Sequence, residues 1–233
     1  MVGEWADKVV MITGASGNLG QAATRRFVRA GAKLVLVERD KRKLAEMVAE
    51  VGGFAGAADV TDAASVDALV KQVEAEYGRI DVLAHTVGGF AAGQRVHEAG
   101  LDVWDKMLNL NAKSVYVTAG RVAQHMVERQ IQGSIVAVVA KNAYRGTAKA
   151  AAYSASKAAA QRVIESMAAE LGPLGITVNA IAPSMIDTPQ NRAASPNADY
   201  SKWVQPEEIA DAIDFLAASR SINGHTLDIF GRA

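Results

Sequence analysis

Short apolar segments alternate along the chain with segments whose apolar residues recur at helical spacing. The apolar segments are typical of strands buried on both faces. They cover residues 9–12, 34–37, 80–84, 134–140 and 176–181, with weaker ones at 54–58 and 226–230. The segments with helical spacing predict helices over residues 19–30, 44–51, 102–129, 150–171 and 206–218. A further helix is predicted to begin after Thr61 or Asp62, as N-cap, and to end at Tyr77.

Buried strands that alternate with helices predict a parallel sheet with helices on both faces. The fold class we predict is α/β, a single doubly wound domain over residues 1–233, because no repeat or linker divides the chain. In such a fold the ligand lies beyond the carboxyl ends of the strands, at the point where the strand order reverses.

One long segment, residues 183–206, has no clear periodicity. Of the five prolines in the chain, all in its last third, only Pro173 lies outside this segment. A loop of this length inside a compact domain is usually functional or mobile. Because it follows a strand at the carboxyl edge of the sheet, we expect a substrate loop that covers the site and becomes ordered when substrate binds.

Composition narrows the functional classes. Lys plus Arg and Asp plus Glu number 25 each, so the formal net charge is zero, which argues against a nucleic-acid partner. The chain has no cysteine, which excludes disulfides, thiolate metal sites and a cysteine nucleophile, and no metal site is expected. We see no signal sequence and no apolar run near the roughly 20 residues that span a bilayer. A cytoplasmic protein without a membrane partner is therefore expected.

A glycine-rich segment, TGASGNLG at residues 13–20, joins the first predicted strand to the first helix. Glycines let a backbone approach a pyrophosphate, and the N-terminus of the helix supplies oriented N–H groups. Glu38 ends the second strand, where an acid can accept hydrogen bonds from a ribose 2′-hydroxyl. A tight turn with a solvated glutamate is the alternative, but the order strand, turn, helix, strand and acid favours a dinucleotide site.

Tyr153 and Lys157 form the single Tyr-x-x-x-Lys sequence of the chain. Their spacing places both side chains on one face of a helix. A phenol of ordinary pKa, about 10, is a poor acid or base at neutral pH, and a neighbouring ammonium favours the phenolate. A solvated pair on a helix face is the alternative, but a pair that follows a nucleotide-binding turn favours catalysis.

These motifs together resemble those of the short-chain dehydrogenase/reductase family. The TGxxxGxG pattern is present except that Asn18 replaces a glycine, and asparagine tolerates left-handed backbone geometry better than other residues with a side chain. NAIAP at residues 179–183 and the segment that ends in Asn111 also resemble the family's motifs. The resemblance covers essentially the whole chain and implies a Rossmann-like fold and an NAD(P)H-dependent oxidoreductase.

The resemblance also implies roles for individual residues. Tyr153 would donate or accept the proton, Lys157 would bind the nicotinamide ribose and lower the pKa of the phenol, and Asn111 would hold a water relay to the lysine. Asp59 would contact the adenine and Thr188 the nicotinamide amide. The cofactor-binding set that follows is Thr13, Gly14, Ser16, Asn18, Leu19, Gly20, Glu38, Arg39, Asp59, Val60, Gly88, Lys157, Pro183 and Thr188.

Residues 85–87 depart from the family's pattern, which has two asparagines and an alanine there. His85 ends a buried strand. We therefore expect a hydrogen-bonded structural histidine, with an acid–base role as the alternative.

Ala140 stands where the family has its active-site serine, so the hydroxyl that polarises the substrate oxygen is absent. Dihydropteridine reductases also have alanine there, and two stretches are similar to theirs, residues 140–147 and 187–203. This resemblance implies substrate contacts by Ala140, Lys141, Asp187, Arg192 and Trp203. For Trp203, anchoring of the loop is favoured over stacking on the substrate.

The leading hypothesis is an NAD(P)H-dependent reductase of a small conjugated carbonyl or imine compound, with dihydropterin as the best guess. The alternatives are a secondary-alcohol dehydrogenase or 3-oxoacyl reductase, and a nucleotide-binding regulatory protein with vestigial activity. Glu38 favours NADH, although Arg39 could pair with the phosphate of NADPH. The family resemblance implies a homodimer or homotetramer built through the long helices around Asn111 and Tyr153.

Overall fold

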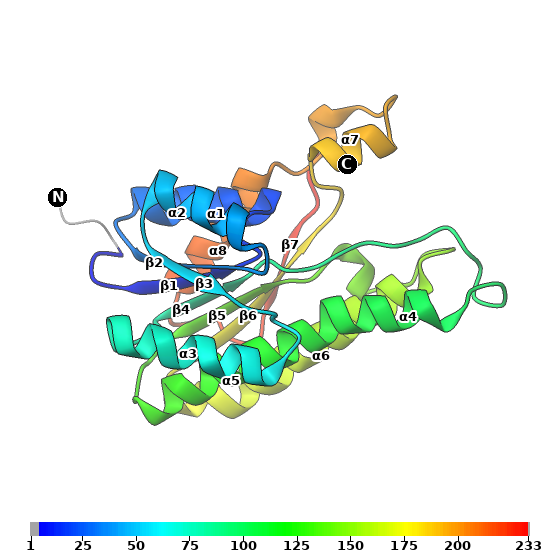
Figure 1. Ribbon diagram of the computed structural model, residues 1–233. Coiled ribbons are helices and arrows are strands. Elements are labelled where there is room, and N and C mark those ends of the chain that lie inside the picture. Colours follow the sequence, from blue (N-terminus) through cyan, green and yellow to red (C-terminus); the bar gives the residue numbers. More distant parts are fainter. Residues whose placement is uncertain (1–4, 233) are drawn as a thin grey trace.

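The computed structural model describes residues 5–232 and is built on a seven-stranded parallel sheet (Figure 1). The strands are β1 (Val9–Thr13), β2 (Lys33–Glu38), β3 (Phe54–Ala57), β4 (Val82–His85), β5 (Ser134–Val138), β6 (Thr177–Pro183) and β7 (Thr226–Ile229). Their order is β3-β2-β1-β4-β5-β6-β7. The predicted fold class is confirmed, and the strand order reverses between β1 and β4.

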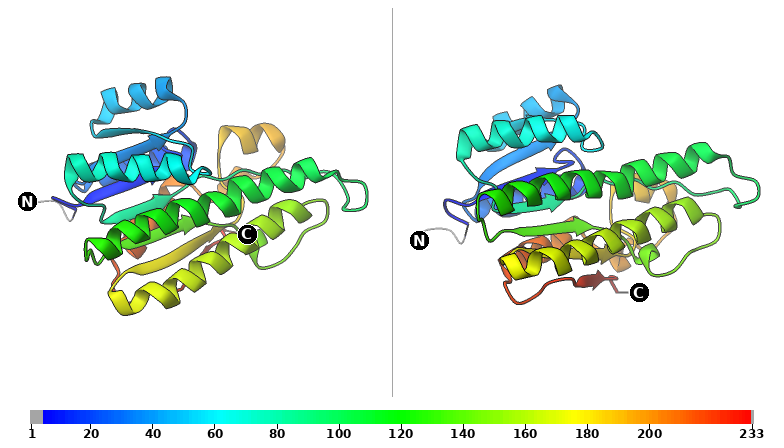
Figure 2. Two further views of the ribbon diagram at one scale, coloured as in Figure 1. Left: turned by 60° about the horizontal axis from the view of Figure 1, so that its bottom comes forward. Right: turned by 90° about the horizontal axis from the view of Figure 1, so that it is seen from below.

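Helices cover both faces of the sheet. On one face lie α1 (Asn18–Arg29), α2 (Lys41–Val51) and α8 (Pro206–Ala218). On the other lie α3 (Ala63–Tyr77), α5 (Ser114–Glu128) and α6 (Ala151–Leu171), side by side in Figure 2. The short helices α4 (Leu101–Met107) and α7 (Pro189–Ala194) lie beyond the carboxyl edge of the sheet.

Successive side chains of each strand point to opposite faces of the sheet and pack into two separate hydrophobic cores. Met11 and Leu83 point toward α3, α5 and α6, whereas Ile12 points toward α1 and α8. On the α8 side, the Trp5 ring packs edge-on against Phe27 at 5.5 Å. The Trp5 indole N–H donates to Asp214 of α8, which also pairs with Arg26 of α1. This polar cluster, in which Trp5 and Asp214 are buried, joins the start of the described chain to its last helix.

The helix ends follow the capping residues of the sequence. Asp62, rather than Thr61, caps α3, and its carboxylate accepts from the Ser65 backbone N–H at 2.7 Å. Gly78, with a φ of +72°, ends the same helix in the left-handed conformation that glycine adopts without strain. Pro206 occupies the first turn of α8, where a missing N–H costs nothing.

The segment 183–206 contains regular structure that the sequence analysis missed. Thr188 caps α7 and Pro189 begins it, a combination that itself predicts a helix start. A 3-10 turn follows at residues 200–202, and a bridge pairs Ile186 with Val204. The sequence analysis did not predict these elements, because their signals are caps and a backbone bridge rather than an apolar period.

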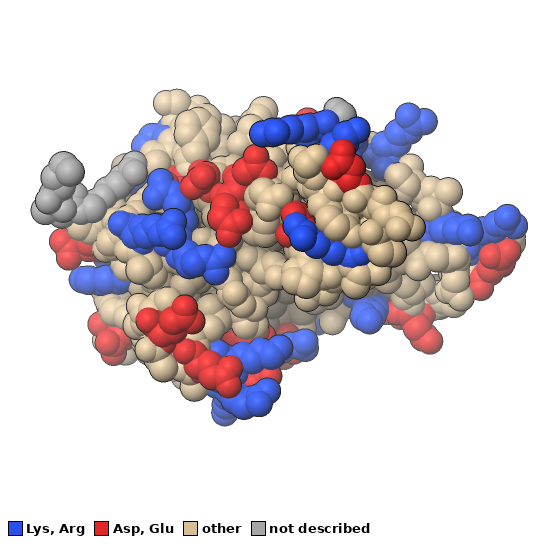
Figure 3. All heavy atoms as spheres, turned by 90° about the horizontal axis from the view of Figure 1, so that it is seen from above, with Lys and Arg blue, Asp and Glu red and all other residues tan. Residues whose placement is uncertain are grey.

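No helix within residues 5–232 is long and apolar enough to cross a membrane. Over the face formed by α1, α2 and α8, basic and acidic side chains are interspersed (Figure 3). That face therefore carries no continuous basic surface.

Candidate active site

The glycine-rich turn lies at the carboxyl end of β1, beside the reversal point of the sheet. Gly14 has a φ of +66°, and a Cβ on Gly20 would lie 2.1 Å from the Gly14 carbonyl oxygen, so both positions require glycine. Gly17 is the N-cap of α1, so the N-terminus of this helix lies next to the glycine-rich turn. This arrangement fits a pyrophosphate, which binds exposed N–H groups at such a helix start.

Asn18 is the first residue of α1 and does not have a positive φ. The expectation that this position must tolerate left-handed geometry is therefore wrong, because the turn has its positive φ at Gly14. The Asn18 amide instead donates to Gln190 Oε1 of α7 at 3.0 Å, which connects the turn to the segment 183–206.

Glu38 ends β2 and Arg39 follows it, beside this turn. The Ser16 hydroxyl donates to Glu38 Oε2 at 2.6 Å, and the Arg39 backbone N–H donates to Oε1 at 2.8 Å. The Arg39 guanidinium lies 4.0 Å from Asp59. Hydrogen bonds from Thr61 hold the pKa of Asp59 below its usual range, so a carboxylate remains there. The Glu38 carboxylate is thus held in place by two hydrogen bonds, while the Arg39 guanidinium lies near Asp59.

A cavity of about 370 Å³ lies where β4, β5 and β6 end, and it contains the predicted catalytic pair. It is lined by Leu19, Thr86, Gly88, Gly89, Phe90, Val138, Val139, Ala140, Lys141, Asn142, Tyr153, Lys157, Pro183, Ser184, Met185, Ile186 and Asn191. The structure therefore brings together seven of the residues expected from the sequence: Leu19, Gly88, Ala140, Lys141, Tyr153, Lys157 and Pro183. We call this cavity the catalytic pocket.

Tyr153 and Lys157 line this pocket from α6, but no hydrogen bond joins them. The Lys157 ammonium donates to the Val138 carbonyl oxygen at 2.9 Å, and burial lowers its pKa to about 8. Burial raises the pKa of Tyr153 to about 12. The expectation that Lys157 lowers this pKa is not met, because the ammonium is turned to the strand end. Tyr153 is therefore a neutral phenol, ready to give a proton.

Asn111 lies in a π-helical segment, Leu108–Lys113, between α4 and α5. Its amide clamps Gly89 from both sides: Nδ2 donates to the Gly89 carbonyl oxygen at 3.0 Å and Oδ1 accepts from the Gly89 N–H at 2.9 Å. Nδ2 also donates to Ser156 Oγ at 3.0 Å, and Ser156 donates to the Tyr153 carbonyl oxygen. Asn111 thus connects the segment after β4 with the catalytic helix. π-Helical segments are frequent at functional sites for this kind of local adjustment.

His85 is fully buried and hydrogen-bonded through both ring nitrogens, as expected for a structural histidine. The Ser114 hydroxyl donates to the Leu110 carbonyl oxygen at 2.6 Å, so its oxygen accepts from His85 Nε2 at 3.2 Å. Nδ1 then accepts from the Thr13 hydroxyl at 3.0 Å. Burial, aided by the positive charge of Lys157, lowers the pKa of His85 to about 3. A neutral imidazole therefore links the glycine-rich turn to the π-helical segment.

Three expected substrate residues do not line the catalytic pocket. Asp187 and Arg192 pair with each other through two hydrogen bonds of 2.6 and 2.7 Å. Trp203 packs on Tyr200 at 4.8 Å, which agrees with the anchoring role. Thr188 also lies outside, as the cap of α7. These side chains form contacts within the segment 183–206, and their expected contacts with substrate or cofactor stay predictions.

Phe90 is a pocket residue that the sequence analysis missed. Its ring meets that of Tyr153 edge-on at 4.9 Å, yet 69% of the residue is exposed. The signal was an aromatic residue directly after Gly88 and Gly89, in a segment with no strand or helix period. A Cβ on Gly89 would lie 2.5 Å from Leu110, so this backbone is held close to the π-helical segment.

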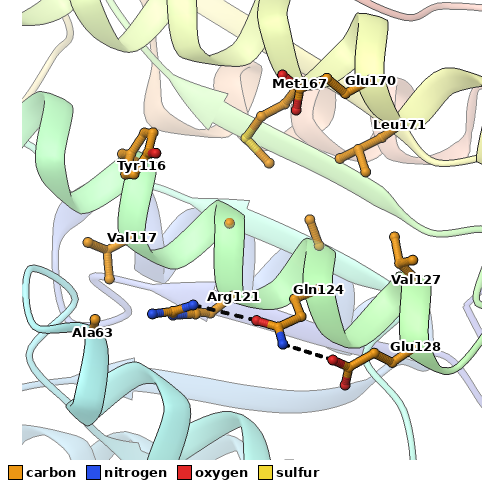
Figure 4. Close-up of a pocket in the computed structure, with 12 residues that line it drawn as sticks. Ala63, Tyr116, Val117, Arg121, Gln124, Val127, Glu128, Met167, Glu170 and Leu171 are labelled. Atoms are coloured by element: carbon orange, nitrogen blue, oxygen red, sulfur yellow. Dashed lines mark hydrogen bonds between the residues drawn. The ribbon is translucent and has the colours of Figure 1, made fainter.

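A second, larger groove of about 690 Å³ runs over the outer faces of α5 and α6 (Figure 4). Its walls carry Tyr116, Val127 and Leu171, together with the polar chain Arg121, Gln124 and Glu128 drawn in Figure 4. It shares no lining residue with the catalytic pocket. We call it the α5/α6 groove.

Comparison with known proteins agrees with this geometry. A family model described as short chain dehydrogenase matches residues 8–199. The chain belongs to this family and is an NAD(P)-dependent oxidoreductase of the short-chain type.

Individual relatives cover nearly the whole chain. A 3-oxoacyl-[acyl-carrier-protein] reductase of Thermotoga maritima is 33% identical over 96% of both chains. A D-threitol dehydrogenase of Mycolicibacterium smegmatis is 33% identical over 96% of this chain and 92% of that one. Among solved structures, a gluconate 5-dehydrogenase of Burkholderia cenocepacia in complex with NADP and tartrate is 28% identical. It superposes with a TM-score of 0.89 over 97% of this chain and 94% of that one.

Proposed function

We propose that this protein reduces a small conjugated carbonyl or imine compound with NAD(P)H, and that a quinonoid dihydropterin is the first compound to test. The observation that carries this proposal is Ala140, which lines the catalytic pocket beside Tyr153 without a hydroxyl. A simple ketone needs a second donor at its oxygen, and removal of such a donor typically costs 10²–10³ in rate. A conjugated, electron-poor acceptor delocalises the developing negative charge and therefore depends less on a second hydrogen-bond donor.

Each residue of the pocket has a part in this reaction. The nicotinamide, when bound, supplies a hydride. Tyr153 gives its phenolic proton to the substrate atom that gains negative charge, and its high pKa keeps that proton in place beforehand. The buried Lys157 ammonium lines the same pocket, and in this proposal it holds the nicotinamide ribose. Phe90 presents an exposed ring beside Tyr153, which suits a flat substrate.

The test is consumption of NADH and NADPH with quinonoid dihydropterin, measured against a panel of secondary ketones and 3-oxoacyl thioesters. Turnover with dihydropterin that exceeds turnover with ketones supports the proposal. The second candidate is a secondary-alcohol dehydrogenase or 3-oxoacyl reductase, which the two 33% identical relatives favour. A preference for ketones or oxoacyl thioesters would select it and reject the first.

For the cofactor we propose NADH over NADPH. Ser16 and the Arg39 N–H orient the Glu38 carboxylate, which would accept from a ribose 2′-hydroxyl and repel a 2′-phosphate. Substitution Glu38→Ala should raise kcat/KM with NADPH relative to NADH. The matched control is Glu46→Ala, on the exposed side of α2. A wild-type enzyme that works better with NADPH would contradict this assignment.

We further propose that two copies associate through the α5/α6 groove. Tyr116 is 69% exposed there, and the groove carries Arg121 together with Glu128 and Glu170, so opposite charges can meet across a two-fold axis. Light scattering coupled to size-exclusion chromatography should give a dimer or tetramer. Substitution Tyr116→Glu should reduce its size, and an unchanged oligomer would reject this interface.

A further inference from the structure

Lys141 lies at the mouth of the catalytic pocket, directly after Ala140, in the 3-10 turn Lys141–Ala143. Its side chain forms no hydrogen bond and no ion pair with any residue between 5 and 232. The ammonium instead lies 4.7 Å from the centre of the Phe230 ring. An aromatic face holds an ammonium in place without neutralising its charge, so Lys141 keeps both its charge and its three donors for another group.

The other polar side chains of the pocket already have partners, with one exception. Thr86 donates to the Thr13 carbonyl, Ser184 to the Phe230 carbonyl, Lys157 to the Val138 carbonyl, Asn191 to the Ile186 carbonyl, and Asn142 to Thr147. The exception is the Tyr153 hydroxyl, which is reserved for the reacting atom. Tyr153 and Lys141 are therefore the two polar side chains that a substrate finds without a partner.

The charge of the pocket has one sign. Lys141 and Lys157 are its two charged lining residues, and it has no aspartate or glutamate among them. Lys157 is buried and turned to a strand end, whereas Lys141 is exposed toward solvent. An anionic substrate is thus attracted to the pocket and meets Lys141 as it enters.

We propose that the substrate of this enzyme carries an anionic group, a carboxylate or a phosphate, that binds the Lys141 ammonium while its carbonyl or imine faces Tyr153. This inference rests on the proposed reduction at Tyr153. It adds that the conjugated compound reduced there carries an anionic substituent, which an unsubstituted dihydropterin lacks. Lys141 is then a specificity-determining residue that touches a part of the substrate remote from the reacting atom.

The experiment uses planar probes that differ in charge: 4-acetylbenzoate, 4-acetylphenyl phosphate and the neutral 4-acetylbenzamide. Dissociation constants are measured by calorimetry on the full-length Tyr153→Phe protein saturated with NADH or NADPH, so that binding is read without turnover. The same titrations are repeated after adding Lys141→Gln, Lys141→Arg, or the control Lys149→Gln. Lys149 is exposed and lies outside the catalytic pocket.

We expect Lys141→Gln to weaken binding of at least one anionic probe ~10-fold and to leave the amide unchanged, as for loss of a hydrogen bond to a charged group. Lys141→Arg should retain most of the affinity, and Lys149→Gln all of it. The probe that responds identifies the carboxylate or the phosphate as the preferred anion. Equal effects on charged and neutral probes, or no binding of either anion, would overturn the proposal. The proposed function is tested by a separate measurement. It would be rejected if the wild-type enzyme oxidised no NAD(P)H with dihydropterin, ketones or thioesters.

Discussion

Acid should destabilise this protein through His85. The imidazole is held neutral between Thr13 and Ser114, with a pKa of about 3 against an ordinary value of 6.5. Because the pKa is lowered on folding, the unfolded chain binds a proton that the folded chain rejects between these two values. The stability that His85 contributes is complete above pH 6.5 and is lost as the pH falls. At pH 5 the loss amounts to ~2 kcal/mol, from 1.36 kcal/mol per pH unit.

The assay is urea unfolding at pH 7.5 and pH 5.0, at one fixed protein concentration because an oligomer is expected. Wild type is compared with His85→Asn, which lacks the titrating group, and with His97→Asn as an exposed control. The asparagine variant should be less stable at pH 7.5 by about 1–3 kcal/mol, because one hydroxyl partner is left unpaired. It should lose ~2 kcal/mol less than wild type on acidification. An equal loss in both proteins would refute the assignment of a buried neutral His85.

Three further outcomes are expected. Tyr153→Phe should lower kcat at least ~10²-fold with NAD(P)H affinity retained in fluorescence titration, and an active variant would mean that another group gives the proton. Ala140→Ser should raise kcat/KM for ketones without raising it for dihydropterin, whereas a uniform gain would mean that the alanine reflects decayed activity. Amide hydrogen exchange in residues 183–206 should slow when substrate and cofactor bind, and equal exchange in the free and bound protein would exclude a lid.

The strands and helices were predictable because their signals are local. Continuous apolar runs gave the buried strands, and Asp62 marked the start of α3. The role of His85 followed as well, because a polar residue at the end of a buried strand must find partners.

Contacts between side chains were less predictable. Asp187 and Arg192 pair with each other around the start of α7, a contact that sequence similarity did not predict. The apolar pattern around Asn111 did not distinguish the π-helical segment from an ordinary helix. The exposure of Phe90 depends on the backbone around it, which the sequence pattern does not describe.

The buried cluster of Trp5, Arg26 and Asp214 has a consequence for how the chain folds as it is made. Trp5 and Asp214 are 209 positions apart, and the apolar face of α1 is covered by α8. During synthesis, strands β1 to β6 can emerge while the part of this face that α8 covers is still open to solvent. At ~5–20 residues per second this interval lasts for many seconds, during which exposed apolar surface favours aggregation. We therefore expect the nascent chain to be prone to aggregation until α8 has been made.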